Sequence, residues 1–512
     1  YSTRGELLYK WGSAEYPVKF LYNEFGDRIE MHTYRSGTAS SWSSAPSIFA
    51  AYPSGFNSAG DKTSWVYDDD SALMTQKLDA GNQGASYNYY SGTPLVTTRT
   101  WARAGAINTS YSYNYAGEVT SQTYSTSDTP SVTYSYERDG RRTGMVDGAG
   151  TWSFTENSAG TTYTEAVSGT GLLSGSTTTA TLDAFGRRTA LSSTWSTSSM
   201  TSVSYTYNST TGRLEKVTDA GVIPNRSATY TYMAYSDLLQ STQFKDNTTL
   251  VTTTTRTYDS QIDRLASIAT TQSGSTINRQ SFLAYDGNHR KTSVETEDLT
   301  KWSYTYNDRG EVTVASRNLS SGTQIWGWGY SYAYDNAGNR TSKSEDIQSV
   351  TYTPNAENEY SSVSTNGYYT VRGKSPGGSA TVTVDGVGQT VDSQSGSDYF
   401  RSQVSASNGS GPVSDQVVIA SGGDSGSWRH FHPAAPVAPT YDPDGNLLTD
   451  GRWTYTWDAE SRLIKMEKSA AAVAAGDENI RLEFDYDGAS CGAGGTLSDN
   501  RSNSGIDGAV VM

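Results

Sequence analysis

One short segment, Tyr330–Thr341, constrains the fold of this chain more than any other. Its first five residues alternate Tyr with Ser or Ala, which is the period of a β-strand with one aromatic face. Asp335–Gly338 then supplies turn chemistry, because an Asp side chain accepts hydrogen bonds from nearby backbone N–H groups and Gly tolerates positive φ. The last three residues begin a return strand. The segment therefore predicts a β-hairpin.

Copies of this hairpin recur along the chain. Anchor positions 182, 207, 232, 258 and 285 follow one another every 25 to 27 residues, a spacing that indicates a solenoid-like array. The predicted structural repeat turns contain Tyr22, Asn23, Gly26, Tyr113, Asn114, Gly117, Tyr136, Gly140, Asp183, Gly186, Tyr306, Asn307, Gly310, Tyr334, Asp335, Gly338, Tyr441, Asp442 and Gly445. Weaker copies lie at Tyr207, Tyr232, Tyr258, Tyr285, Trp457 and Tyr486.

The tandem Tyr-Asp-x-x-Gly-Asn/Arg units resemble the YD-repeat, or Rhs (rearrangement hotspot), family. That family includes bacterial Rhs proteins, the C components of insecticidal toxin complexes and the teneurin adhesins. The match covers most of residues 15–365 and 440–488, and Tyr441–Glu467 resembles the late repeats of the family. The resemblance implies a spiralling sheet that closes into a large hollow shell. The predicted fold class is all-β: a spiralling antiparallel β-hairpin repeat array with a small inserted β-sandwich-like module.

The composition supports a folded β protein with a polar skin. Hydrophobic residues make up only 35% of the chain, but 37 Tyr and 12 Trp supply amphipathic rings that can cover one face of a sheet. The net charge is −15, and no basic stripe is visible, so nucleic acid is excluded as an expected partner. No apolar run is long enough to span a membrane. The chain opens at Tyr1 with no methionine, which suggests a piece of something longer.

The repeat pattern divides the chain into five predicted parts. The anchors Tyr352 and Tyr441 are separated by more than three periods, and the residues between them contain short β-branched strands. The parts are 1–64, an irregular N-terminal β segment; 65–366, the repeat array; 367–427, a small all-β insert of immunoglobulin-like or carbohydrate-binding type; 428–488, a linker and the last repeats; and 489–512, a disordered tail.

Residues with catalytic or metal-binding chemistry are few, and none forms a recognisable site. His32 and His289 are isolated, and His430 and His432 form a pair that lacks a third ligand and lies beside prolines typical of a linker. Cys491 has no histidine near it, so a catalytic thiol is not expected. We therefore predict no catalytic residue, no cofactor and no metal.

Two acidic motifs are interpreted as turns. Asp68–Asp70 lacks the spaced ligands of a calcium-binding loop. Rhs proteins often cut themselves at an Asp-Pro-x-Gly-Leu motif, which Asp442–Gly445 resembles, but Asn446 replaces the Leu. Pro at the second position of a turn is expected in any repeat. We therefore predict that this chain is not cut.

Three functions remain open at this point. The first is a non-catalytic β-shell scaffold, secreted or on the cell surface, that encloses a passenger or toxin polypeptide. The second is a structural or adhesive extracellular protein that assembles with copies of itself into filaments. The third is a protein that binds or cleaves surface glycans, with the Tyr and Trp face as a sugar platform. The expected partners are accordingly an enclosed polypeptide, a cell-surface glycan or protein, or further copies of this chain.

Overall fold

The computed structural model describes residues 1–37, 60–171, 173–196, 198–221, 225–345, 348–365, 367–376, 381–394, 396–486, 492–499 and 508–510. These residues form β-strands numbered to β43 and a single short helix, α2 (Ala470–Ala474). No helix in these ranges is long and apolar enough to cross a membrane. The prediction of an all-β fold is confirmed.

The first 29 strands form one sheet, which we call the first winding. Its strands are β1 (Tyr9–Lys10), β2 (Val18–Tyr22), β3 (Arg28–Thr33), β4 (Asp61–Tyr67), β5 (Met74–Leu78), β6 (Ser86–Tyr89), β7 (Val96–Thr100), β8 (Asn108–Tyr113), β9 (Val119–Tyr124), β10 (Val132–Tyr136), β11 (Arg142–Asp147), β12 (Gly150–Glu156), β13 (Thr162–Ser168), β14 (Ser176–Leu182), β15 (Arg188–Trp195), β16 (Ser198–Tyr207), β17 (Leu214–Asp219), β18 (Arg226–Tyr232), β19 (Leu239–Asp246), β20 (Thr249–Tyr258), β21 (Leu265–Gln272), β22 (Ser275–Tyr285), β23 (Lys291–Thr296), β24 (Lys301–Tyr306), β25 (Val312–Asn318), β26 (Gln324–Tyr334), β27 (Arg340–Glu345), β28 (Gln348–Pro354) and β29 (Tyr360–Val363).

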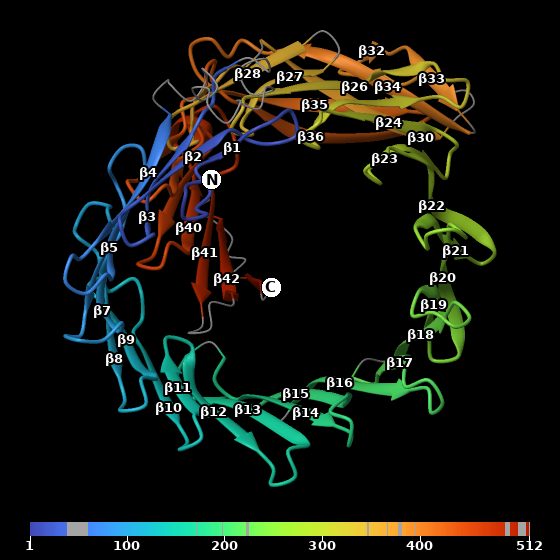
Figure 1. Cartoon of the computed structure of the whole chain (residues 1–512). Coiled ribbons are helices and arrows are strands. Elements are labelled where there is room, and N and C mark those ends of the chain that lie inside the picture. The colour runs from blue at the N-terminus through green and yellow to red at the C-terminus, as the bar shows by residue number, and fades with distance from the viewer. Residues whose placement is uncertain are drawn as a thin grey trace.

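Each strand of the first winding pairs antiparallel with the next strand in the chain, so the sheet is a long meander. Figure 1 shows that the ribbon bends into a ring. The expected boundary at residue 65 falls inside β4. The described residues of the predicted N-terminal β segment, 1–64, do form strands, but β1 to β3 pair in the same sheet as the repeats, so the array begins before residue 65.

The repeat turns are held by their first residue, as the sequence predicts. Asp335 Oδ1 accepts hydrogen bonds from the backbone N–H groups of Ala337 at 2.9 Å and Asn339 at 2.8 Å. Gly338 has a φ of 93°, a region that side chains disfavour. The same pair of bonds recurs in the turns that begin at Asn23, Asn114, Asp183, Asp286, Asn355, Asp442 and Asp458.

The inserted module is a two-sheet sandwich, which we call the insert. One sheet contains β30 (Tyr368–Pro376), β33 (Val391–Gln394) and β34 (Ser397–Ser405), and the other contains β31 (Thr383–Val384), β32 (Val387–Gly388), β35 (Val413–Ser421) and β36 (Asp424–His432). Its core packs Tyr369, Val371, Val382, Phe400 and Val417 between the sheets.

The insert ends five residues later than the sequence suggested. The predicted linker at 428 is wrong for Trp428–His432, which pair with β35 as the second half of β36. His430 and His432 therefore lie on a strand, where both rings stack near Tyr369. The prolines that follow mark the end of this strand rather than a linker that contains the histidines.

The ribbon resumes after the insert as a second winding. Val363 at the end of the first winding pairs with Val437, which leads into β37 (Thr440–Tyr441). The remaining strands are β38 (Leu447–Thr449), β39 (Trp453–Trp457), β40 (Leu463–Lys468), β41 (Ile480–Tyr486), β42 (Gly492–Asp499) and β43 (Gly508–Val510). The predicted disordered tail over 489–512 is wrong for β42 and β43, because backbone pairing with β41 needs no side-chain pattern. The rest of that tail lies outside the described residues.

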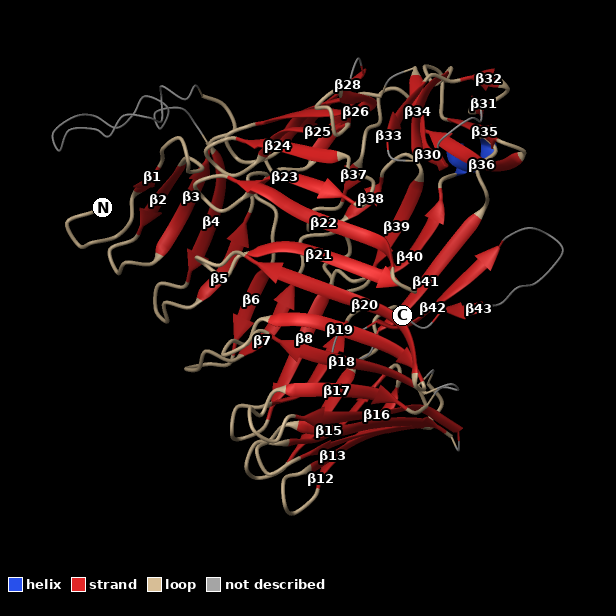
Figure 2. Ribbon diagram, turned by 90° about the vertical axis from the view of Figure 1, so that its right-hand side faces the viewer, coloured by secondary structure: helices blue, strands red, loops and turns tan. Residues whose placement is uncertain are grey.

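Polar contacts join the beginning of the first winding to its later part, and others join the second winding to the first. The backbone N–H of Asn336 donates to the carbonyl of Arg35 at 3.1 Å, and the Arg35 guanidinium donates to the carbonyl of Pro354 at 2.6 Å. Further along, Asp444 accepts from the backbone N–H groups of Ala102 at 2.8 Å and Arg103 at 3.2 Å. Turn tips of a later part of the ribbon thus rest on the opposite strand ends of an earlier part, and Figure 2 shows the spiral from the side.

Candidate functional site

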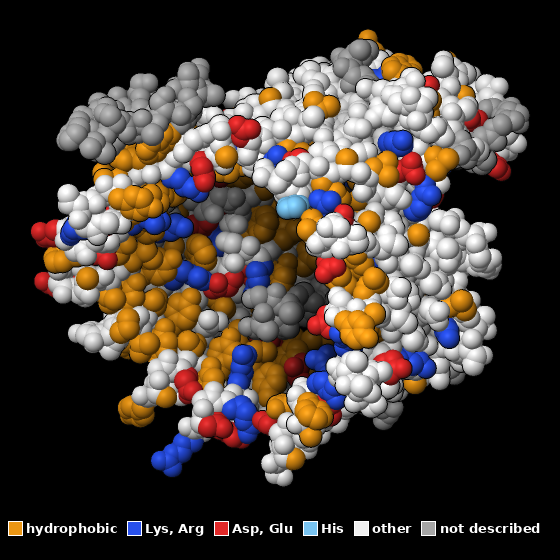
Figure 3. Space-filling view, turned by 45° about the vertical axis from the view of Figure 1, so that its right-hand side comes forward, with side chains coloured by type: hydrophobic (Ala, Val, Ile, Leu, Met, Phe, Trp, Pro, Cys, Tyr) orange, Lys and Arg blue, Asp and Glu red, His pale blue; other side chains and the backbone are white. Residues whose placement is uncertain are grey.

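The candidate site is the wall of the hollow inside the spiral. On β16, Val203, Tyr205 and Tyr207 are half-buried, whereas the alternating Ser202, Ser204 and Thr206 are exposed. Figure 3 shows hydrophobic side chains gathered on the wall of a hollow in the molecule. The insert packs against the same aromatic face, since Tyr399 of β34 contacts Trp328 of β26 with ring centroids 5.7 Å apart. The aromatic face of the ribbon is therefore the inner face.

Anchor tyrosines link neighbouring hairpins along this wall. Each hydroxyl donates to a backbone carbonyl near the start of an earlier strand, at 2.6 to 3.1 Å. The donors are Tyr22, Tyr67, Tyr89, Tyr113, Tyr136, Tyr207, Tyr232, Tyr258, Tyr285, Tyr306, Tyr334 and Tyr486. The wall is thus a ladder of rings that are fixed at both ends.

Arginines stack on many of these rings. The Arg187 guanidinium lies 4.4 Å from the ring centroid of Tyr207, and that of Arg264 lies 3.9 Å from Tyr285. Each arginine follows a repeat turn and covers the anchor ring of the next hairpin, so the ladder is reinforced by cation–π contacts. Burial raises the pKa of Tyr111, Tyr134 and Tyr304, which keeps these phenols neutral at physiological pH.

The wall carries open, largely apolar depressions. One depression of about 460 Å³ is lined by Val217, Ala228 and Phe244, with Arg226 and Asp246 at its side. Phe244 keeps 46% of its surface exposed although it points to the inner face. The Arg226 Nε atom lies 3.5 Å from Asp246, so the charges there are paired. Such a surface can bind apolar segments without selecting one shape.

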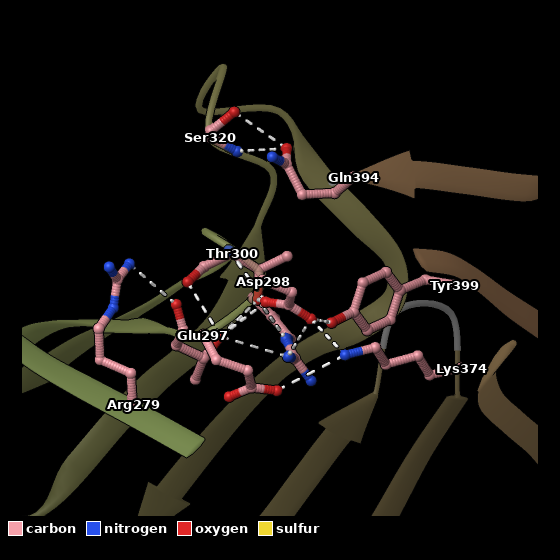
Figure 4. A network of polar contacts seen from close by, with 10 residues as sticks. Arg279, Glu297, Asp298, Thr300, Ser320, Lys374, Gln394 and Tyr399 are labelled. Atoms are coloured by element: carbon pink, nitrogen blue, oxygen red, sulfur yellow. Dashed lines mark hydrogen bonds and ion pairs between the residues drawn. The ribbon is translucent and has the colours of Figure 1, made fainter. Parts of the chain in front are cut away.

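A polar network holds the insert against the first winding (Figure 4). Asp298, which is almost fully buried, accepts hydrogen bonds from the hydroxyl of Tyr399 and from Lys374 Nζ, the latter at 2.9 Å. Arg317 approaches the same carboxylate at 3.4 Å. Burial alone would raise the pKa of Asp298, but the hydrogen bonds from Tyr399 and Lys374 hold it well below its ordinary value. This network fixes the insert against the first winding.

The predicted turn residues are where the sequence placed them, but they do not converge on one site. They are spread along the edge of the spiral, one turn per hairpin. Asp442 accepts the two backbone hydrogen bonds of an ordinary repeat turn, and Asp444 accepts a hydrogen bond from the first winding. Within the described residues, no group of three or more His, Cys, Asp or Glu side chains could hold a metal ion. Cys491 lies outside those residues.

Sequence reasoning missed a rule that the turns obey. In four turns that begin with Asn, an acidic residue follows four positions later, as in Asn114 and Glu118. In five turns that begin with Asp, the fourth residue on is Arg or Asn, as in Asp286 and Arg290. In both cases the first side chain bonds to the fifth. The pairing was readable from the spacing, because an amide can donate to a carboxylate and a carboxylate needs a donor.

Comparisons with known proteins identify the fold. No protein-family model matches the sequence, and no curated protein matches it. The crystal structure of TcdB2-TccC3 without its hypervariable C-terminal region is similar, with a TM-score of 0.53 and 12% identity. That likeness covers 100% of this chain and 28% of the other. The chain has the fold of a toxin-complex shell.

Two further solved structures agree. The crystal structure of TcdB2-TccC3 matches with a TM-score of 0.50 and 12% identity, over 98% of this chain and 28% of the other. The Photorhabdus luminescens Tc holotoxin pore with a TccC3 mutation matches with a TM-score of 0.52 and 12% identity, over 98% of this chain and 27% of the other. This chain thus spans under a third of the toxin-complex chains that it resembles. The expected likeness to such shells is confirmed for the fold, and membership of the YD-repeat family stays a prediction.

Proposed function

We propose that this chain is a non-catalytic, extracellular shell scaffold whose hollow encloses a passenger polypeptide. The observation that carries the proposal is the apolar, partly exposed inner wall, with Phe244 as its clearest case. An exposed aromatic wall is costly in water unless something covers it, because each buried aromatic contributes roughly 2–3 kcal/mol. An unfolded polypeptide offers apolar side chains at many positions and fits a wall without a shaped pocket.

The fold supports the same proposal. One of the toxin-complex structures that share it, that of TcdB2-TccC3, is described as being without a hypervariable C-terminal region. A scaffold that holds variable cargo needs broad apolar contact rather than specific hydrogen bonds. The ladder of tyrosines and arginines makes such a wall rigid.

Encapsulation can be tested with an unfolded probe. The chain would be refolded from urea together with fluorescein-labelled α-lactalbumin that has been reduced and carboxymethylated, then separated by size and treated with protease. We expect the probe to co-elute at high salt and to resist cleavage. A probe that is digested as fast as the free polypeptide would rule out encapsulation.

A matched pair of variants tests the wall itself. Phe244→Asp places a charge on the inner face, and Val314→Asp places one on the outer face at a similar starting exposure, 46% against 44%. The inner variant should lose most of the protected probe, and the outer variant should keep it. Equal loss in both would show that protection does not come from the hollow.

The second candidate, a filament or adhesive role, is favoured by a different observation. Exposed apolar side chains lie on the turns at both edges of the first winding, and not only on its inner wall.

A further inference from the structure

The two ends of the first winding differ in their turns. In the meander, every turn from an even-numbered to an odd-numbered strand lies at one end, which we call the Asx-turn rim. Every turn from an odd-numbered to an even-numbered strand lies at the other end, which we call the short-turn rim. Figure 2 shows loops at both ends of the strands.

Large apolar side chains project from the tips of the Asx-turn rim. Phe25, Tyr115, Phe185 and Tyr235 expose 75%, 112%, 84% and 106% of their surfaces. Each is the second or third residue of a four-residue turn or stands just before its positive-φ position. The backbone N–H groups of Phe25 and Phe185 donate to the first side chain of their turns, but the four rings take no part in the turn hydrogen bonds. Apart from a contact between Arg187 and the ring of Phe185, their size is not explained by the hairpins that carry them.

The short-turn rim is apolar as well. Met200, Leu250 and Ile277 expose 56%, 51% and 50% of their surfaces, and each lies at or beside a turn between an odd strand and the following even strand. These three turns belong to the middle of the first winding. The polar contacts of the second winding fall instead on Ala102, Arg103 and Thr129.

The chain already contains the contact that would join these rims. Within one molecule, the tips of Asx turns rest on the short-turn end of the ribbon: Asp444 on Ala102 and Arg103, and Ala459 on Thr129 at 2.7 Å. The tips that make those contacts are small or acidic. Four of the tips left open carry aromatic rings, and three of the open short turns carry Met, Leu or Ile. The same geometry therefore continues on both free rims with apolar chemistry.

We infer that copies of this chain stack head to tail, with the Asx-turn rim of one copy on the short-turn rim of the next. The two rims are different surfaces, so the contact is heterologous and does not close after two copies. Because the second winding is displaced from the first along the axis of the spiral, each end of the molecule is stepped rather than flat. A second copy placed on that end continues the spiral in the same direction. The hollows then join into one channel. This inference does not depend on the proposed passenger.

The test is sedimentation velocity of the whole chain over a concentration series up to about 100 µM, a range that detects weak association. We expect oligomers that grow with concentration. Replacing Phe25, Tyr115, Phe185 and Tyr235 together by Ser should weaken association by about tenfold or more. Val66→Ser with Val314→Ser removes exposed apolar residues from the outer face and should change nothing. Circular dichroism checks that every variant is folded.

A mixing experiment fixes the direction of stacking. A second variant, with Met200, Leu250 and Ile277 replaced by Ser, blunts the short-turn rim alone. Each blunted variant should be monomeric by itself, and an equal mixture of the two should form dimers and nothing larger, because only one productive contact remains. A wild-type chain that stays monomeric, a rim variant that associates like the wild type, or a mixture without dimers would each overturn the inference.

Discussion

The hydroxyl of Tyr285 donates a hydrogen bond to the backbone carbonyl of Leu265 at 2.6 Å. Leu265 belongs to the return strand of the preceding hairpin, so this bond ties two repeats together. The side chain of Arg264, one residue earlier, covers the ring of the same tyrosine. Tyr285 thus takes part in the packing of the wall through its ring and in the spacing of two repeats through its hydroxyl.

Removing this hydroxyl should weaken the joint between two hairpins. Tyr285→Phe keeps the ring and its arginine contact but leaves the Leu265 carbonyl without this donor, at an expected cost of about 1 kcal/mol in the free energy of unfolding. Urea denaturation measures the change. Tyr235→Phe is the control, because that ring is fully exposed, and it should have no effect. Equal losses would show that the hydroxyl bond does not contribute.

Two turn glycines separate backbone strain from crowding. Gly117 has a φ of 83° with no atom within 4 Å of an added Cβ, so Gly117→Ala should cost about 1–2 kcal/mol from φ alone. Gly338 has a φ of 93°, and an added Cβ would lie 3.0 Å from the ring of Tyr16. Gly338→Ala should therefore cost more than Gly117→Ala in chemical denaturation. The reverse order would show that Tyr16 yields freely.

The buried carboxylate of Asp298 should dominate the attachment of the insert. Asp298→Asn leaves Lys374 and Arg317 facing a neutral amide in a buried network, and we expect a loss of about 3 kcal/mol in unfolding free energy. Glu297→Gln is the matched control: it touches the same lysine at 3.6 Å but is a third exposed, so its loss should stay within about 1 kcal/mol. Similar losses for the two variants would contradict the assigned role.

The repeated hairpin pattern made the architecture predictable from the sequence. The contacts between segments far apart in the chain could not be predicted in this way. Strand period and turn chemistry are local, so the sequence indicated the hairpins and the aromatic face from Tyr330 to Tyr334. The end of the insert was placed too early because Pro433 looked like part of a linker, while the pairing of Trp428 with Val417 lies outside the reach of a local pattern. The hydrogen bond from Tyr399 to Asp298, which ties the insert to the wall, likewise joins residues far apart in the chain.

We expect the insert to become less stable at acidic pH because His430 becomes protonated. Burial lowers the pKa of His430 below its ordinary value of 6.5, with His432 and Arg452 acting in the same direction and Asp415 against it. Because the unfolded chain then binds the proton more readily, the stability that this group contributes is present above pH 6.5 and is lost as the pH falls below it. His430→Phe keeps a ring on Tyr369 and should flatten the unfolding profile between pH 7 and pH 5. A variant whose profile is as steep as that of the wild type would contradict this role of His430.

We expect the contact between the two windings to be lost before the hairpins unfold. The Asp444 carboxylate is buried and accepts two backbone N–H groups of the first winding, so Asp444→Ala leaves both donors without a partner. We expect a loss of about 2 kcal/mol or more, since each buried unsatisfied donor costs about 1–3 kcal/mol. Asp139 stands at the same turn position in the first winding but bonds only within its own turn, to Arg141, and is exposed. The loss in Asp139→Ala should stay within about 0.5 kcal/mol.

In Asp444→Ala, hydrogen exchange should be faster at Ala102, at Arg103 and in β37 to β40, and unchanged in β12 to β22, because a repeat array transmits a local loss mainly to its neighbours. Uniform loss of protection over both windings would show instead that the spiral unfolds as one unit.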